Sequence, residues 1–154
     1  MAKILVVYYS RTGHTEQVAK ALAETLGADL ERISEPRKRH GIWEYLKSAR
    51  EALRGTLPTI EPGEHDPSGY DLVVLGSPVW ASRPSTPLRA WLAAHKDNLG
   101  KMACFVTLGG SGAQKTLERI SEAAGKPALA TFSATEGELK RGIWKQDFDR
   151  FAQT

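Results

Sequence analysis

The apolar residues of the sequence gather in short unbroken runs, and between these runs they recur at every third or fourth position. The clearest runs are "KILVVYY" (residues 3–9), "DLVVLGS" (71–77) and "MACFVTL" (102–108). Such runs predict β-strands that are buried on both faces, because successive side chains of a strand point to opposite sides. Weaker runs at 28–33 and 128–134 predict two further strands.

The segments between these runs have the spacing of amphipathic helices. We expect helices over residues 13–26, 42–54, 86–95 and 113–124, and a short last helix with Trp144, Phe148 and Phe151. Residues that favour helix ends agree with these bounds: Thr12 and either Ser85 or Thr86 as N-caps, Pro87 at a first helical position, and Gly27, Gly55 and Gly125 past the ends. Three prolines and three glycines between 55 and 70 predict a surface loop.

Strands that alternate with helices predict an α/β fold of the doubly wound class, with a five-stranded parallel sheet and helices on both of its faces. A length of 154 residues is typical of a single domain, here residues 1–154. Ligands of such sheets bind beyond the carboxyl ends of the strands. We therefore look for a site in the turns at 10–15, 77–87 and 107–113.

The first of these turns is rich in hydrogen-bond donors and poor in bulk. Its residues are Ser10, Arg11, Thr12, Gly13, His14 and Thr15. A strand that leads through such a turn into a helix N-terminus presents free backbone N–H groups and the positive end of the helix dipole, which suits a phosphate group. The turn lacks both the Gly-Lys-Ser/Thr of a Walker loop and the three glycines of a dinucleotide fingerprint, so a monophosphate is the better fit. The alternative is a well-capped turn without a ligand.

The other two turns offer surfaces rather than charges. "GSPVWASRPSTP" (76–87) contains Trp80, which either covers the core or offers a stacking face to a planar ring. "TLGGSGA" (107–113) is nearly free of side chains, which suits either a simple turn or main-chain contact with the polar edge of a ligand.

Composition limits the classes of protein that need to be considered. Hydrophobic residues make up 41% of the chain and the mean hydropathy is −0.36, values typical of a globular protein in water. No apolar run approaches the roughly 20 residues of a membrane helix, and the first run reads as a strand rather than a signal peptide. The single cysteine, Cys104, allows no intramolecular disulfide, so we expect a reducing compartment, the cytoplasm.

The net charge of +3 is concentrated in one segment. Residues 36–55 hold six Lys/Arg against two Glu, a local net charge of +4, so the rest of the chain sums to −1. Nucleic-acid binding is therefore not expected. The basic face of residues 37–54 is either a solvated surface or a binding surface for an acidic partner or a nucleotide phosphate.

The pattern S-x-T-G-x-T between a strand and a helix, followed by "GSPVWA" and a glycine-rich third turn, resembles the flavodoxin family over essentially the whole chain. The resemblance implies the strand order 2-1-3-4-5 and bound FMN. By position, Ser10 to Thr15 would hold the 5′-phosphate. Pro78, Val79, Trp80 and Ala81 would line one side of the isoalloxazine ring, and Leu108, Gly109, Gly110 and Gly112 would approach its other side.

Two departures from the family pattern concern these site residues. His14 stands where many flavodoxins have Asn, which brings a potential cation near the phosphate. Ala81 stands where flavodoxins often have Gly, and its Cβ disfavours the positive φ of a backbone flip that the family uses in one-electron transfer.

The resemblance implies a carrier of electrons between redox partners, in which no side chain acts as a catalytic acid or base. The alternative is an FMN-dependent oxidoreductase linked to NAD(P)H or a quinone, with Arg83 and the basic helix at 42–54 receiving a negative group of the substrate. A hydrolase is a third class, because "GGSGA" (109–113) loosely matches the G-x-S-x-G elbow, but no His follows Ser111 as that motif requires. The four His are scattered, so no metal site is expected.

Overall fold

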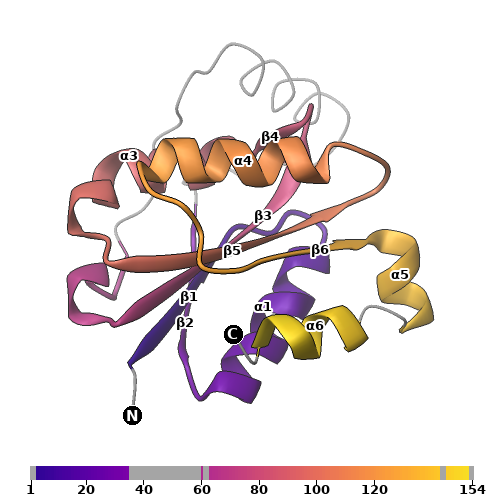
Figure 1. Ribbon diagram of the computed structural model, residues 1–154, viewed down its shortest axis with the longest axis horizontal. Helices are drawn as coiled ribbons and strands as arrows, with labels where there is room; N and C mark the ends of the chain where they lie inside the picture. Colours follow the sequence, from indigo (N-terminus) through magenta and orange to yellow (C-terminus); the bar gives the residue numbers. More distant parts are fainter. Residues whose placement is uncertain (1–2, 35–59, 61–62, 143–144, 153–154) are drawn as a thin grey trace.

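A computed structural model describes residues 3–34, 60, 63–142 and 145–152 of the chain (Figure 1). The helix predicted at 42–54, the basic face of 37–54 and residues 55–59 and 61–62 of the loop predicted at 55–70 lie outside the described residues. The elements are β1 (Ile4–Tyr8), α1 (His14–Leu26), β2 (Asp29–Arg32), β3 (Leu72–Trp80), β4 (Arg83–Pro84), α3 (Thr86–His95), β5 (Lys101–Leu108), α4 (Ala113–Ala124), β6 (Thr131–Thr135), α5 (Glu136–Arg141) and α6 (Lys145–Ala152), with short 3-10 turns at Pro67–Gly69 and Lys96–Asn98.

The sheet has the order β2-β1-β3-β5-β6, and all of these pairings are parallel. This confirms the predicted order 2-1-3-4-5 for the parallel strands. The short strand β4 adds an antiparallel pairing to the end of β3. The strand order reverses between β1 and β3, so the carboxyl ends of these two strands border the crevice where such sheets hold ligands.

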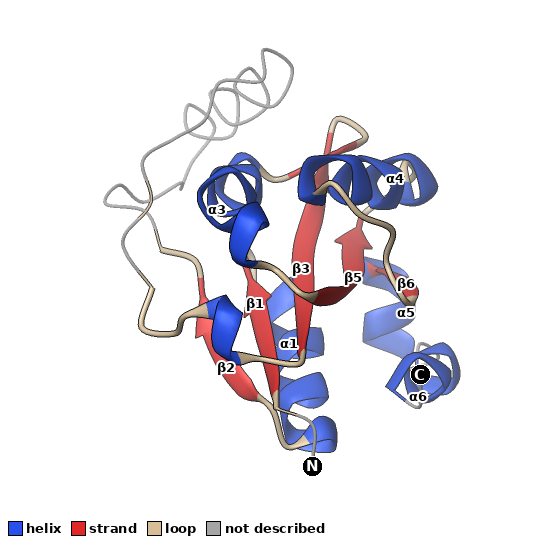
Figure 2. Cartoon of the chain, turned by 60° about the vertical axis from the view of Figure 1, so that its left-hand side comes forward, coloured by secondary structure: helices blue, strands red, loops and turns tan. Residues whose placement is uncertain are grey.

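Helices cover both faces of the sheet, as the doubly apolar strands predict (Figure 2). On one face α3 and α4 pack against alternate strand residues in a core that includes Leu75, Leu88, Trp91, Met102 and Ile120. On the other face α1, α5 and α6 contribute to a core that includes Val6, Leu22, Phe105, Leu139 and Phe151. Among the described residues, no helix has the length and apolarity needed to cross a membrane.

The prediction that residues 77–87 form a loop is wrong in its first half. Strand β3 continues to Trp80, turns at Ala81 and Ser82, and returns as β4, with Trp80 opposite Arg83. A two-residue hairpin turn of this kind needs positive φ at both positions and is usually built from Asn and Gly. Here Ala81 has φ 52° and Ser82 has φ 59°, so no turn signal was visible in the sequence.

Three element ends also differ from the prediction. Helix α1 is preceded by Gly13 in the left-handed conformation, without a side-chain cap, so Thr12 is not its N-cap. Ser85 does cap α3, with Pro87 at its second rather than first position. Strand β6 begins at Thr131 instead of residue 128, and the helix α5 that follows it was not predicted.

Candidate functional site

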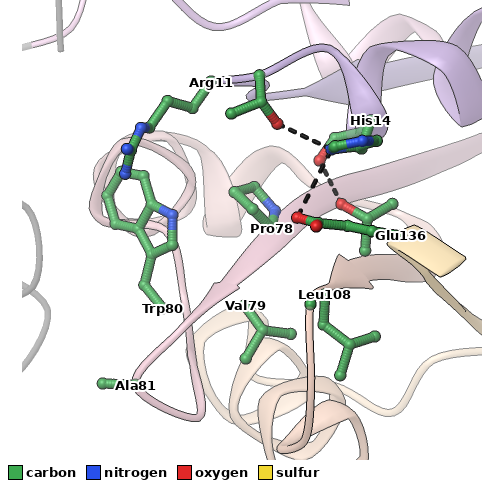
Figure 3. Close-up of a pocket in the computed structure, with 12 residues that line it drawn as sticks. Arg11, His14, Pro78, Val79, Trp80, Ala81, Leu108 and Glu136 are labelled. Carbon is green, nitrogen blue, oxygen red and sulfur yellow. Dashed lines mark hydrogen bonds and ion pairs between the residues drawn. The ribbon is translucent and has the colours of Figure 1, made fainter. Parts of the chain in front are cut away.

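A pocket of about 310 Å³ lies at the carboxyl edge of the sheet (Figure 3). All three turns singled out in the sequence contribute to it. Its lining consists of Arg11, Thr12, His14, Thr15, Pro78, Val79, Trp80, Ala81, Thr107, Leu108, Gly109 and Glu136.

Four of the predicted site residues do not line this pocket. Ser10 is buried behind the first turn, and Gly13 joins that turn to α1. Gly110 is exposed in the third turn, and Gly112 packs against Ser82 of the hairpin. Two lining residues, Thr107 and Glu136, were not predicted. Thr107 lies inside a buried strand, and Glu136 begins the helix that was not predicted, so neither stood out in the sequence.

The first turn leaves its helix N-terminus open toward the pocket. The Ser10 hydroxyl accepts a hydrogen bond from the Gly13 N–H (3.1 Å), which shapes the turn. Helices α3 and α5 begin with a side-chain cap, from Ser85 and Thr135, whereas α1, like α4, begins after a left-handed glycine without one. Among the described residues, the N–H groups in the first turn of α1 therefore have no side-chain acceptor, and an anion in the pocket would accept their hydrogen bonds.

A cluster of polar side chains braces the first turn from behind. Arg32 donates to the carbonyl oxygen of Ser10 (3.1 Å) and lies 3.7 Å from the carboxylate of Glu16. The Tyr8 hydroxyl donates to the same carboxylate (3.3 Å). Burial, followed by the nearby charge of Glu16, raises the pKa of Tyr8 to about 12, so this donor keeps its proton. The position of the turn is thus set from β2 as well as from β1.

A buried hydrogen bond connects the first turn to β5 below the pocket. The hydroxyls of Thr15 and Thr107 lie 2.7 Å apart, and both residues are buried. Because Thr15 belongs to the first turn of α1 and Thr107 to the end of β5, this contact holds the two walls of the pocket at a set separation.

One side of the pocket contains a chain of titratable and polar groups. The Thr12 hydroxyl lies 2.9 Å from His14 Nδ1, and the same nitrogen lies 3.7 Å from a Glu136 carboxylate oxygen (Figure 3). The first turn and the start of α5 thus bring an imidazole and a carboxylate together at the wall of the pocket.

The opposite side of the pocket is apolar and includes an aromatic face. Trp80 meets Tyr9 edge to face, with ring centroids 5.6 Å apart and planes at 86°. Tyr9 is buried, so this contact holds the indole in position at the pocket wall. Together with Pro78, Val79 and Leu108, Trp80 offers the surface that a planar ring needs for stacking.

These features fit a phosphate ester that carries a flat aromatic ring: open N–H groups and hydroxyls at one end, and apolar walls at the other. They do not resemble a hydrolytic site, because Ser111 is exposed and makes no hydrogen bond with a histidine among the described residues. The described part of the chain also contains no group of three or more His, Cys, Asp or Glu side chains that could hold a metal ion.

Curated relatives match part of the chain. An NAD(P)H dehydrogenase (quinone) from Azorhizobium caulinodans is 35% identical over 99 residues, which is 60% of this chain and 46% of the relative. A protein of the same name from Caulobacter vibrioides is 34% identical over 61% of this chain and 47% of the relative. The aligned residues thus span about half the length of these relatives.

Solved structures match nearly the whole chain. A flavoprotein from Lactobacillus acidophilus, crystallised in complex with FMN, superposes with a TM-score of 0.77 at 24% identity, covering 94% of this chain and 99% of the flavoprotein. A flavodoxin-like WrbA-like protein from Agrobacterium tumefaciens has a TM-score of 0.60 at 17% identity, covering 99% of this chain and 96% of that protein. At these identities the likeness shows the fold.

The sequence model of the flavodoxin family matches residues 3–147, and thus includes all three turns that converge on the pocket. The strand order is the one that the resemblance to flavodoxins implies. This chain therefore belongs to the flavodoxin family.

Proposed function

We propose that the chain binds FMN in the pocket at the carboxyl edge of the sheet and carries electrons between redox partners. The observation that carries this proposal is the meeting of an uncapped helix N-terminus and a fixed indole face in one pocket. FMN has the matching parts, a phosphate dianion and a planar ring. We place this function in the cytoplasm.

The residues of the first turn, Ser10 to Thr15, would bind the 5′-phosphate through backbone N–H groups and hydroxyls. Trp80, with Pro78, Val79 and Ala81, would orient the ring and keep water from one of its faces. Leu108 and Gly109 would approach the other side, with Gly110 and Gly112 shaping that turn. Bound FMN supplies the redox chemistry itself, and the chain supplies binding, orientation and electrostatics.

A second candidate function is the FMN-dependent transfer of electrons from NAD(P)H to a quinone. The curated relatives named NAD(P)H dehydrogenase (quinone) favour it, since they share 34–35% identity with this chain. The aligned region covers about half of each relative, so their complete activity is a proposal for this chain.

The binding proposal is tested by comparing FMN with riboflavin, which lacks the phosphate. In the variant Thr12→Ala we expect the affinity for FMN to fall about tenfold, because a potential hydrogen bond to a charged group is lost while the buried Thr15–Thr107 contact is kept. The affinity for riboflavin should change little. Quenching of flavin fluorescence measures both.

The matched control is Thr25→Ala, which removes an exposed hydroxyl at the far end of the same helix. It should leave both affinities unchanged. Equal losses for FMN and riboflavin in Thr12→Ala would contradict the assignment of the first turn to phosphate.

Anaerobic mixing of the FMN-loaded protein with NADPH distinguishes the two candidate functions. Direct bleaching of the visible flavin absorption is expected of the oxidoreductase. Bleaching only after a separate reductase is added is expected of the electron carrier.

A further inference from the structure

A second cleft lies beside the β3–β4 hairpin and is lined by other residues than the FMN pocket. Four cationic side chains from three elements line it: Arg83 of β4, Arg89 of α3, and Lys115 and Arg119 of α4. Its remaining lining is Pro84, Ala123 and the carboxylates of Glu118 and Glu122. The cations outnumber the carboxylates, so the cleft has a net positive charge.

The cations in this cleft are close enough to disfavour one another. The pKa of Arg89 is lowered by burial and then by the positive charges of Arg83 and Arg119. Within the described part of the chain, Arg83, Lys115 and Arg119 form no ion pair with a carboxylate. Glu118 accepts a hydrogen bond from Gln114 instead (3.4 Å). Positive side chains that line a cleft and are not neutralised by carboxylates favour the binding of an anion.

The hairpin contributes residues to the lining of both the cleft and the FMN pocket. Trp80 and Ala81 line the pocket, while Arg83, directly opposite Trp80 in the hairpin, lines the cleft. Helix α4 packs against the hairpin, with Gly112 in contact with Ser82, and β4 lies beside α4 in Figure 1. A ligand that extends from the flavin ring over the hairpin would therefore reach the cations.

We propose that this cleft binds the 2′-phosphate of NADPH, so that the protein prefers NADPH to NADH. The inference rests on the second candidate function, the oxidation of NAD(P)H. If the nicotinamide ring of NAD(P)H lies against the flavin ring, the adenosine half of the dinucleotide lies outside the FMN pocket. A phosphate monoester is a compact dianion, and the planar guanidinium groups of several arginines suit its oxygens.

The shape of the cleft favours a small phosphate ester over an acidic protein surface. Its cations converge from β4, α3 and α4 on a hollow rather than spreading over a broad face. Glu118 and Glu122 also line the cleft, and their carboxylates would repel an extended polyanion.

The test titrates the FMN-loaded protein with adenosine 2′,5′-bisphosphate and with 5′-AMP, which differ only in the 2′-phosphate. By calorimetry we expect the bisphosphate to bind at least about tenfold more tightly. The variants Lys115→Gln and Arg119→Gln should each reduce this ratio several-fold and leave the affinity for 5′-AMP unchanged. Lys101→Gln, an exposed lysine at the start of β5 and outside the lining, is the matched control and should change neither.

Equal affinities for the two nucleotides would overturn the inference. So would an equal loss of both in Arg119→Gln, because the cleft would then meet the shared 5′-phosphate. The flavin reaction separates this inference from the function on which it rests. If NADPH and NADH bleach the flavin equally fast, the protein oxidises both dinucleotides and the proposed preference for NADPH is wrong. If the bisphosphate is preferred but neither dinucleotide bleaches the flavin, the cleft binds the 2′-phosphate but the protein is not an NAD(P)H oxidoreductase.

Discussion

Two residues at the tip of the β3–β4 hairpin hold a backbone conformation that their side chains disfavour. Ala81 and Ser82 both have positive φ, which costs a residue with a Cβ roughly 1–2 kcal/mol. Packing of Gly112 at the start of α4 against Ser82 helps to hold the turn in place. The hairpin presents Trp80 to one site and Arg83 to the other, so its conformation matters to both proposed ligands.

Replacing Ala81 by Gly should relieve this conformational cost. We expect Ala81→Gly to raise the free energy of unfolding by about 0.5–1 kcal/mol, since the relief exceeds the entropy that a glycine loses on folding. Ala93→Gly, at an exposed position in the ordinary helix α3, is the control and should lower it by about 1 kcal/mol. Urea denaturation measures both. A fall of the same size in both variants would show that the turn is not strained at Ala81.

At the scale of elements, β3 carries the central part of the sheet and the apolar wall of the pocket. Its Gly76 is paired in register with Phe105 of β5, and the Phe105 ring lies where a Gly76 side chain would be. Past this point the Ser77 hydroxyl accepts a hydrogen bond from the Ser85 N–H (2.8 Å), which ties β3 to the start of α3. The close approach at Gly76 thus sets the packing of β3 against β5, and the Ser77 hydrogen bond positions the start of α3.

The variant Gly76→Ala should destabilise the sheet. Its methyl group would overlap the Phe105 ring, and overpacking of this kind costs about 1–3 kcal/mol in the free energy of unfolding. The control Gly69→Ala adds the same methyl group where no atom lies within 4 Å, so its effect should stay within about 0.5 kcal/mol. Thermal and urea unfolding of the two variants make the comparison. Equal stabilities would mean that Phe105 moves aside at little cost.

At the scale of the whole molecule, the sheet separates two cores, and each holds a group that ionises only at high pH. Burial raises the pKa of Cys104, on the side of α3 and α4, to about 12. The pKa of Tyr8, on the side of α1, is also raised to about 12. Both groups keep their protons in the folded state at pH values where the unfolded chain has lost them.

Stability should therefore fall as the pH rises. The unfolded Cys104 thiol ionises near its ordinary pKa of 9.0, and above that pH ionisation lowers the free energy of the unfolded state, whereas the folded thiol ionises only near pH 12. We expect a constant unfolding free energy at pH 7–8 and a decline between about pH 9 and 12. Cys104→Ala should decline less steeply over that range, whatever its stability at pH 7. Urea titrations at successive pH values measure the slopes, and identical slopes for the two proteins would contradict the role of the buried thiol.

Local pattern was enough to predict most elements of this fold. The apolar runs at 3–9, 71–77 and 102–108 predicted the central strands, because burial on both faces leaves a signal at every position. Helix α5 and the β3–β4 hairpin were missed. The capping box of Thr135 and Glu138 is visible in the sequence, but the helix that follows it is only six residues long. The hairpin turn consists of Ala81 and Ser82 instead of the usual Asn and Gly.

By itself, the sequence determined the class of fold and the order of the elements, and it predicted a phosphate-binding first turn, because each depends on neighbours within a few positions. The tertiary structure decided which distant residues share a site. Thr15 and Thr107 are 92 positions apart yet bond below the pocket, and Glu136 reaches His14 from the far end of the chain. The cations of the second cleft come together only because α3 and α4 pack side by side on the sheet, a long-range arrangement that no local pattern encodes.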